Sequence, residues 1–506
     1  MHLKRLVPTA VFMLSAILLQ AHSLMHEGSG VNARVLDKTK KAKPHFNKVA
    51  YGVVANAVPD VDPKDKDEGS TLIFNLGEEQ IGYLRDFLTA TGHDWSMEEF
   101  QKFRGVINAA VEDHPEVLSV NAARRSAGFS VREAWAAKLP QVTGQSQRGP
   151  VKSDPSAVLN TPGRDYKSAS VGVVIRQLLF DFGASSNTID ANSARDELAQ
   201  YKAKFSRSDV ALRAVQAQHE LLRAHRQVEL AKRNLQARQS ILDLVSQRQE
   251  LGGGTMSDVV RARSRVADAA AAEVSARQRL HIVESSYREI FGPNRDVNSD
   301  IANVLVDIPL DKSLLDEINR EAPESLKVRM AIAARNAAEY DYKSFVAKGL
   351  PTLSVEASHT RRDLAGPGEP GVDKSVYVVL RHNFYTGGAD TAREDQYREK
   401  LQQSEEDVRV AKREAEKLFT QALMESNSIE LLIKSRLKAV ELSADSLRMV
   451  REQFAYRRGS LLDLLTAQES LNSAGRDLID AQIDSAQAKY KVLYSSSLLN
   501  KFFSLE

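Results

Sequence analysis

Residues 179–183 read Leu179-Phe180-Asp181-Phe182-Gly183, and residues 383–388 read Asn383-Phe384-Tyr385-Thr386-Gly387-Gly388. In both places, alternating apolar and polar residues precede the aromatic pair, and a long helical pattern follows the glycine. Alternation is typical of strands, whereas a period of about 3.6 is typical of helices. Each stretch therefore predicts a direct change from strand to helix. The two stretches lie about 205 residues apart, so the chain makes the same transition twice.

Other short motifs recur at nearly the same offset and in the same order. The first copy contains Ala122-Ala123-Arg124, Leu139-Pro140 and a Gly-x-x-x-Asp turn at 254–258; the second contains Ala333-Ala334-Arg335, Leu350-Pro351 and the same turn at 459–463. A repeat of this length is longer than a solenoid unit. We therefore predict two tandem structural repeats, at 96–292 and 317–499, joined by a loop-rich crossover at 293–316.

Each repeat has two strand-like segments. Apolar and polar residues alternate over about 140–149 and 169–180 in the first repeat, and over about 351–361 and 374–384 in the second. These lengths match a tilted strand that crosses a bilayer, which needs about 9–11 residues. A soluble β-hairpin shows the same alternation. The pattern therefore predicts strands but does not by itself identify lipid.

Very long helices follow the strand pairs. The helical pattern is unbroken over 184–251 and over 389–458, and shorter helices are predicted at 256–291 and 460–498. Each repeat also begins with a helix, at about 115–138 and 323–349, and Pro115 interrupts the helical pattern that precedes the first of them. At 1.5 Å per residue, each long helix spans on the order of 100 Å. A narrow apolar seam of the coiled-coil kind is formed by Leu437, Val440, Ala444, Leu447, Val450 and Phe454. The chain is thus predicted to be an α+β protein of long coiled-coil helices and short strand pairs.

The N-terminus has the order of a cleavable secretory signal over residues 1–23. Lys4 and Arg5 precede an apolar run that ends at Leu19, and small residues follow to Ser23. The run of about fourteen apolar residues is shorter than the ~20 that a spanning helix needs. Residues 24–95 form an N-terminal extension, which is predicted to be partly disordered because its first part is charged and poor in apolar residues.

Composition argues against several classes of protein. The chain has no cysteine, which argues against disulfides, thiolate metal sites, cysteine nucleophiles and an N-terminal lipid anchor. Without Lys4 and Arg5, 67 basic residues balance 67 acidic ones, so no basic excess indicates nucleic acid. His219 and His225 are six residues apart on a helix and do not share a face, as metal ligands would. No phosphate loop or nucleophile elbow is found. We therefore predict no catalytic residues, no cofactor and no metal.

In this order of elements, the chain resembles the TolC family of outer-membrane channel proteins over roughly residues 100–500. The resemblance rests on the two strand-to-helix stretches, the two Gly-x-x-x-Asp turns and the two Leu-Pro pairs. It implies a homotrimer whose three chains form one barrel of twelve strands in the lipid of the outer membrane, continued by an α-helical tunnel in the periplasm. It also implies two partners, a periplasmic adaptor (a membrane fusion protein) and an inner-membrane transporter of the ABC or RND type. A physical argument also requires the sheet to close, because lipid offers no hydrogen-bond partners to the backbone N–H and C=O groups of open strand edges.

The two turns are the first candidate site. Each has a glycine, a hydroxyl and an acid: Gly254, Thr255 and Asp258 in one, and Gly459, Ser460 and Asp463 in the other. In one interpretation, the hydroxyl caps the next helix and the acid is favoured by the helix dipole. The resemblance implies a second role at the periplasmic entrance, where six carboxylates of a trimer would ring the pore and attract cations. Thr466 stands where some members carry a further acid, which argues against a tight acidic gate.

The strand-to-helix junctions are the second candidate site. They contain four aromatic residues and two glycines: Phe180, Phe182, Gly183, Phe384, Tyr385 and Gly387. The aromatic residues fit an interfacial girdle of a membrane barrel or ordinary packing at a bend. The glycines are expected to relieve crowding there.

The leading functional hypothesis is a passive outer-membrane exit duct for type I protein secretion. The stretch from Gly459 to Leu465 resembles the corresponding stretch in members that serve this system, and many drug-efflux members are lipoproteins, which need a cysteine. The first alternative is the outer-membrane component of a multidrug or metal efflux pump. The second is a periplasmic coiled-coil adaptor, which would carry one helical hairpin between compact β domains. A soluble coiled-coil scaffold would leave the signal peptide unexplained.

Overall fold

The structure, a computed structural model, describes residues 97–153, 164–293, 312–365, 371–456 and 459–505, together with Leu305 and Ile308. All of them belong to one compact unit, Lys66–Glu506. The predicted signal peptide at 1–23, the extension at 24–95 and most of the crossover at 293–316 lie outside the described residues.

Two helices separated at His114 open the first half of the described chain. α3 (Met97–Asp113) ends there, and His114 Nδ1 accepts a hydrogen bond from the backbone N–H of Glu116 at 3.3 Å. Pro115 takes the first position of α4 (Pro115–Ala136), where a helix does not need the missing N–H. Proline therefore starts a new helix at the residue where the sequence indicates an interruption.

The remaining long elements occur in the same order in both halves. The first half continues with β1 (Gln141–Ser153), β2 (Arg164–Phe180), α5 (Ala184–Glu250) and α6 (Met256–Phe291); the second contains α8 (Leu326–Lys348), β3 (Thr352–Ala365), β4 (Gly371–Arg381), α9 (Ala389–Ala455) and α10 (Leu461–Ser495). α5 and α9 each contain 67 residues. The predicted fold class, long helices combined with short antiparallel strands, is confirmed. Within the described ranges, no helix has both the length and the apolar character that crossing a membrane requires.

Short helices mark two departures from the sequence prediction. α7 (Lys312–Glu321) begins inside the crossover that we predicted to be loop-rich, and the 3-10 helix η3 (Ala322–Glu324) follows it. The cause is an apolar pair one turn apart, Leu314 and the fully buried Ile318, which pack into a shared core. The helix predicted to reach residue 498 ends at Ser495, because Ser497 has a left-handed φ of 65° before α11 (Leu499–Phe503) begins.

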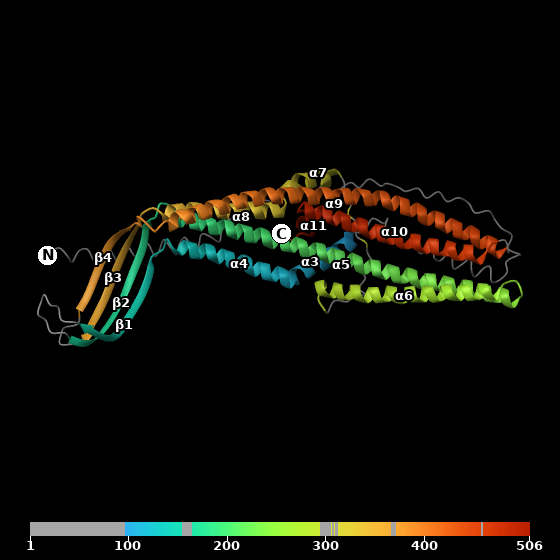
Figure 1. The fold of residues 1–506 in the computed structure, drawn as a ribbon, viewed down its shortest axis with the longest axis horizontal. Helices are drawn as coiled ribbons and strands as arrows, with labels where there is room; N and C mark the ends of the chain where they lie inside the picture. Colours follow the sequence, from blue (N-terminus) through green and yellow to red (C-terminus); the bar gives the residue numbers. More distant parts are fainter. Residues whose placement is uncertain are drawn as a thin grey trace. The chain divides into compact units, whose positions relative to one another are not determined.

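The strands form one antiparallel sheet in the order β1-β2-β3-β4 (Figure 1). β2 pairs with β1 and also with β3, so the two halves of the chain meet inside the sheet. β4 ends at Arg381, short of the predicted end at residue 384. Its last partner is Thr352, and Pro351 before that residue has no N–H with which to extend the ladder.

The two faces of the sheet differ in chemistry. Residues directly opposite each other share a face, and one face carries the apolar rows Ile175–Ala357–Val376 and Val355–Val378. On the other face, Arg176 Nε lies 2.7 Å from Glu356 Oε1, and the hydroxyls of Ser358 and Ser375 are 2.7 Å apart. The sheet thus has an apolar face and a polar face, as a membrane barrel with a wet lumen requires.

α5 connects most of the helical part. It packs against α4 and α6 of its own half and against α8 and α10 of the other, while α9 packs against α8 and α10 (Figure 1). These contacts bury two large apolar cores at different levels of the helices. The middle core joins α3, α5, α7, α10 and α11, with Phe103, Tyr490 and Phe503 almost wholly buried. The turn core joins α5, α6, α9 and α10 beside the two helical turns.

Candidate functional site at the helical turns

The first turn connects α5 to α6 through Leu251–Thr255. The amide of Gly253 donates to the carbonyl of Arg248 at 2.8 Å, and Gly252 takes a left-handed φ of 75° that glycine adopts without strain. Thr255 is the N-cap of α6, and its Oγ1 accepts from the backbone N–H of Asp258 at 3.2 Å. Asp258 Oδ2 in turn accepts from the backbone N–H of Thr255 at 3.4 Å, which completes a capping box.

The second turn connects α9 to α10 and has the same ending. The amide of Gly459 donates to the carbonyl of Gln453 at 3.0 Å. Ser460 is the N-cap of α10, and its Oγ accepts from the backbone N–H of Asp463 at 3.1 Å. Gly459 sits in a tight position, because a Cβ there would lie 2.9 Å from the backbone nitrogen of Phe454.

Both aspartates form hydrogen bonds within their own turn, and both remain accessible to water. Thr255 Oγ1 and Ser460 Oγ each donate to a carboxylate oxygen at 2.8 Å, of Asp258 and Asp463 respectively. Asp463 is exposed and Asp258 is partly exposed. The carboxylates can therefore support the helix ends and still present charge to the surroundings.

The turn core brings the two turns to one end of the helical part. Val259 at the start of α6 and Leu461, Leu464 and Leu465 at the start of α10 belong to the same buried cluster. The Arg248 guanidinium lies over the Phe454 ring at 4.5 Å, so the end of α5 touches the end of α9 directly. The predicted turn residues are thus gathered at one place in the fold.

Two buried arginines lie near this end of the helices. Arg451 is only 9% exposed, and its Nη2 donates to Gln468 Oε1 at 3.2 Å. Among the described residues, no carboxylate lies within ion-pair distance of Arg451, and burial lowers its pKa to about 10. Arg238 is 4% exposed and lies 2.6 Å from Glu469 on α10. These cations link the long helices to α10 from the interior.

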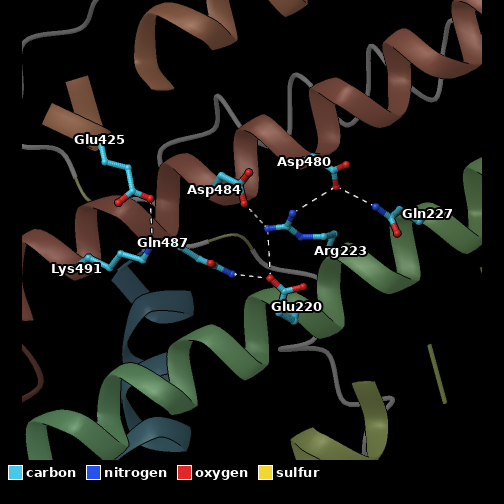
Figure 2. Close-up of polar contacts among 8 residues, drawn as sticks. All are labelled: Glu220, Arg223, Gln227, Glu425, Asp480, Asp484, Gln487 and Lys491. Carbon is cyan, nitrogen blue, oxygen red and sulfur yellow. Dashed lines mark hydrogen bonds and ion pairs between the residues drawn. The ribbon is translucent and has the colours of Figure 1, made fainter. Parts of the chain in front are cut away.

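Farther along the helices, a polar network joins α5 to α10 (Figure 2). Arg223 Nη2 lies 2.5 Å from Asp484 Oδ1, and Arg223 Nη1 lies 3.4 Å from Asp480 Oδ1. Glu220 lies 3.3 Å from the same guanidinium, and Gln227 donates to Asp480 at 2.9 Å. Burial alone would lower the pKa of Arg223, but the bond to Asp484 and the neighbouring acids raise it. The network therefore holds a permanent cation between the two halves of the chain.

His219 lies one turn before Arg223 and is fully buried. Its ring is 5.6 Å from that of Tyr490 and is stacked at 6.4 Å on that of Phe103. Neither ring nitrogen has a hydrogen-bond partner within the described part of the chain. Burial first, and the charge of Arg223 second, lower the pKa of His219 to about 3, so the imidazole is neutral near pH 7.

The strand-to-helix junctions lie at the other end of the long helices. Phe180 and Phe182 are about half exposed with ring centroids 4.7 Å apart, and Phe384 and Tyr385 are 91% and 86% exposed. Gly183 is the N-cap of α5 with a left-handed φ of 89°. The second junction has two such positions, with φ of 69° at Gly387 and 82° at Gly388, the N-cap of α9. The glycines thus allow the chain to bend from strand into helix, and the aromatic rings are exposed.

Comparison with known proteins identifies the fold and shows which outer-membrane proteins the chain resembles. Residues 106–292 match the family model described as outer membrane efflux protein. The chain is 25% identical over 394 residues to the outer membrane efflux protein BepC of Brucella suis, covering 77% of this chain and 84% of BepC. It is 24% identical over 436 residues to the alkaline protease secretion protein AprF of Pseudomonas aeruginosa, covering 81% and 84%. The crystal structure of the outer membrane protein VceC from Vibrio cholerae matches with a TM-score of 0.69 at 16% identity, over 78% of this chain and 96% of VceC. In sequence and in fold, the chain is similar to the TolC family of outer-membrane channels.

The similarity to TolC-family channels gives the location and the general function of the molecule. The protein lies in the outer membrane through its sheet, and its helices extend into the periplasm. It is an exit duct and a passive channel, not an enzyme. The alternative of a periplasmic adaptor is therefore wrong. Within the described ranges, no group of three or more His, Asp or Glu side chains could hold a metal ion.

Sequence reasoning about this chain missed the buried polar groups. Arg451 lies four residues after Leu447 of the apolar seam, so its position on the buried stripe could have been read from the spacing. The Arg223 network could not be found in this way. Two of its three acids, Asp480 and Asp484, come from a helix more than 250 residues away, and only the packing of α10 on α5 brings them to Arg223.

Proposed function

We propose that three copies of this chain close one barrel of twelve strands, and that their helices form a periplasmic tunnel that receives cargo from an inner-membrane transporter through a periplasmic adaptor. The support is the open sheet: β1 and β4 each have one unpaired edge within the described sheet. Lipid offers no hydrogen-bonding partner to such edges, and bacterial barrels have at least eight strands. Three chains of four strands satisfy both conditions.

The cargo in this proposal is protein delivered by a type I secretion system. The observation that carries it is the turn from Gly459 to Leu465, which resembles that of secretion members. AprF is named as an alkaline protease secretion protein, and PrtF of Dickeya chrysanthemi, 23% identical, is named as a proteases secretion protein. The second candidate is drug or metal efflux, which is favoured by the printed name of BepC, an efflux protein at 25% identity.

Deletion of the gene separates the two cargoes. We expect the deletion strain to lose one or more secreted proteins from its culture medium, measured by quantitative proteomics, with little change in drug or metal tolerance. The wild-type gene supplied on a plasmid should restore secretion. An unchanged set of secreted proteins together with a sharp rise in drug or metal sensitivity would reverse the assignment in favour of efflux.

Within this duct, we propose that Asp258 and Asp463 line the periplasmic entrance. The support is that the turn core gathers both turns at one end of the helices and that both carboxylates are accessible to water. Six such charges in a trimer would attract cations and repel anions.

The entrance role predicts a change in selectivity that capping alone does not. The double substitution Asp258→Asn and Asp463→Asn removes charge and keeps hydrogen-bonding ability. It should reduce cation preference and weaken block by multivalent cations in planar-bilayer recordings. Thermal stability of the assembled protein serves as the control, because caps contribute only about 0.5–2 kcal/mol each. Unchanged selectivity and block would limit these residues to capping.

A further inference from the structure

The apolar face of the sheet changes character toward the end that lies away from the helices. His359 of β3 lies directly opposite Lys374 of β4, and this row follows the apolar row Ala357–Val376. Arg361 is two residues farther along β3 on the same face. In β1, the pairing of Arg148 with Ala169 of β2 places it on this face as well. All four basic side chains are exposed. We call this set the outward basic cluster.

The outward basic cluster extends from the upper half of the apolar band, at His359 and Lys374, to the height of the outer lipid headgroups, at Arg148. The helices are periplasmic, so the opposite end of the strands faces the cell exterior. With about 3.4 Å per residue and a tilt of about 40°, Lys374 lies about 15 Å above Leu353 at the periplasmic end, and Arg148 lies about 25 Å above it. The apolar band of a barrel is about 25 Å tall. Arg148 starts at the edge of this band, and the long side chain of Lys374, which starts lower, extends toward the same edge.

The basic residues on the two faces of the sheet differ in their ion pairs. On the polar face, Arg176 pairs with Glu356, and Arg362 pairs with Asp373. On the apolar face, Arg148, His359 and Lys374 form no ion pair within the described part of the chain. An uncompensated cation is unfavourable beside hydrocarbon. Phosphate groups of lipid headgroups would supply the missing negative charge.

We propose that the outward basic cluster binds the phosphate groups of phosphorylated lipid in the outer leaflet of the outer membrane. The surface beneath the charges fits the rest of such a lipid. A shallow hollow of about 280 Å³ is lined by Val173, Ile175, Ala357 and Val376 and is bordered by His359 and Lys374. Apolar side chains there contact the upper part of an acyl chain, while the basic groups above them hold the phosphate and fix the depth of the barrel.

The test uses the full-length protein purified in detergent and titrated with fluorescent lipopolysaccharide, either intact or with its lipid phosphates removed. The test variant carries Arg148→Gln, His359→Gln, Arg361→Gln and Lys374→Gln. The matched control carries Arg176→Gln and Arg362→Gln, which remove basic groups from the polar face of the same strands. We expect the test variant to bind intact lipid at least about tenfold more weakly, and the control to bind like wild type. Loss of the lipid phosphates should weaken binding to wild type to a similar extent.

A conservative variant guards against misfolding. Arg148→Lys, His359→Lys, Arg361→Lys and Lys374→Arg keep the charge and should retain binding. Equal affinity of wild type for intact and dephosphorylated lipid would overturn the proposal. So would undiminished binding by the test variant, or competition by millimolar inorganic phosphate as strong as that by intact lipid. Normal lipid binding with loss of the assembled oligomer in the test variant would assign this face to contacts between copies instead.

Discussion

Gly459 leaves no space for a side chain, whereas its counterpart Gly254 does. A Cβ at Gly459 would lie 2.9 Å from the backbone nitrogen of Phe454, but a Cβ at Gly254 would come no closer than 3.4 Å to the backbone of Gln249. Gly459→Ala should therefore cost about 1–3 kcal/mol through overpacking, and Gly254→Ala should change stability by less than about 0.5 kcal/mol. Thermal unfolding followed by circular dichroism measures both. Equal melting temperatures of the two variants would contradict this steric explanation.

The titration of one buried residue, His219, makes the free energy of unfolding depend on pH. Its pKa is about 3 in the folded protein against about 6.5 in an unfolded chain, so below pH 6.5 the unfolded state binds the extra proton. The contribution of this residue to stability is therefore complete above pH 6.5 and falls as the pH drops toward 3. By pH 5 the loss should be about 2 kcal/mol.

The variant His219→Phe keeps an aromatic ring beside Phe103 and Tyr490 and removes the titrating group. The free energy of unfolding of this variant should fall less than that of wild type between pH 7 and pH 5. His281→Gln is the control, because the His281 side chain is 75% exposed and outside the core. A His219→Phe variant that is as sensitive to acid as wild type would rule out this origin of the pH dependence.

At the scale of elements, α5 and α10 are held together by a cation that is almost withdrawn from water. The Arg223 side chain is 13% exposed, and removing it would leave Glu220, Asp480 and Asp484 close to one another without compensation. Arg223→Met should therefore destabilise the protein by about 1–3 kcal/mol, which is below the value for a fully buried pair because the acids are partly solvated. Arg436→Met is the matched control. That arginine also pairs with an aspartate of α10, Asp477, but both side chains are 40% exposed, so the loss should be below about 1 kcal/mol. Chemical unfolding gives both values, and equal losses would show that burial is not what matters here.

Elements with a strong local pattern were the most predictable ones. The alternation before Phe180 and the helical pattern after Gly183 can each be read from neighbouring residues alone. The structure has β2 and α5 at these positions. The weakly apolar β1 extends to Ser153, beyond the predicted residue 149, because pairing with the well-patterned β2 determines its length. α7 was missed because its apolar residues form a helix only where the middle core covers Ile318. The Arg223 network depends mainly on contacts between α5 and α10, which are far apart in the sequence, so local patterns could not predict it.

At the scale of the whole molecule, the open edges of the sheet predict a ring of three chains. Because the chain has no cysteine, engineered cysteines can report the contact between copies without background. Ser375→Cys on β4, combined in turn with Thr143→Cys, Gln145→Cys or Gln147→Cys on β1, tests the pairing of one copy's β4 with another's β1. In at least one combination, oxidation should give covalent products that end at three chains on denaturing gels. Single-cysteine variants should form none of the larger products. A series that ends at two chains, or continues beyond three, would exclude the threefold barrel.

The middle core also determines when the protein can finish folding. Phe103 of α3 packs against Phe503, with ring centroids 6.1 Å apart, and Asn108 Nδ2 donates to the carbonyl of Phe503 at 3.0 Å. These partners lie about 400 residues apart in the chain, so α3 has no complete site to dock on until about 400 further residues have been synthesised. Contacts of such long range form slowly. A polypeptide that must pass through the inner membrane as an extended thread would gain from this delay, because its own core cannot close before translocation is nearly complete.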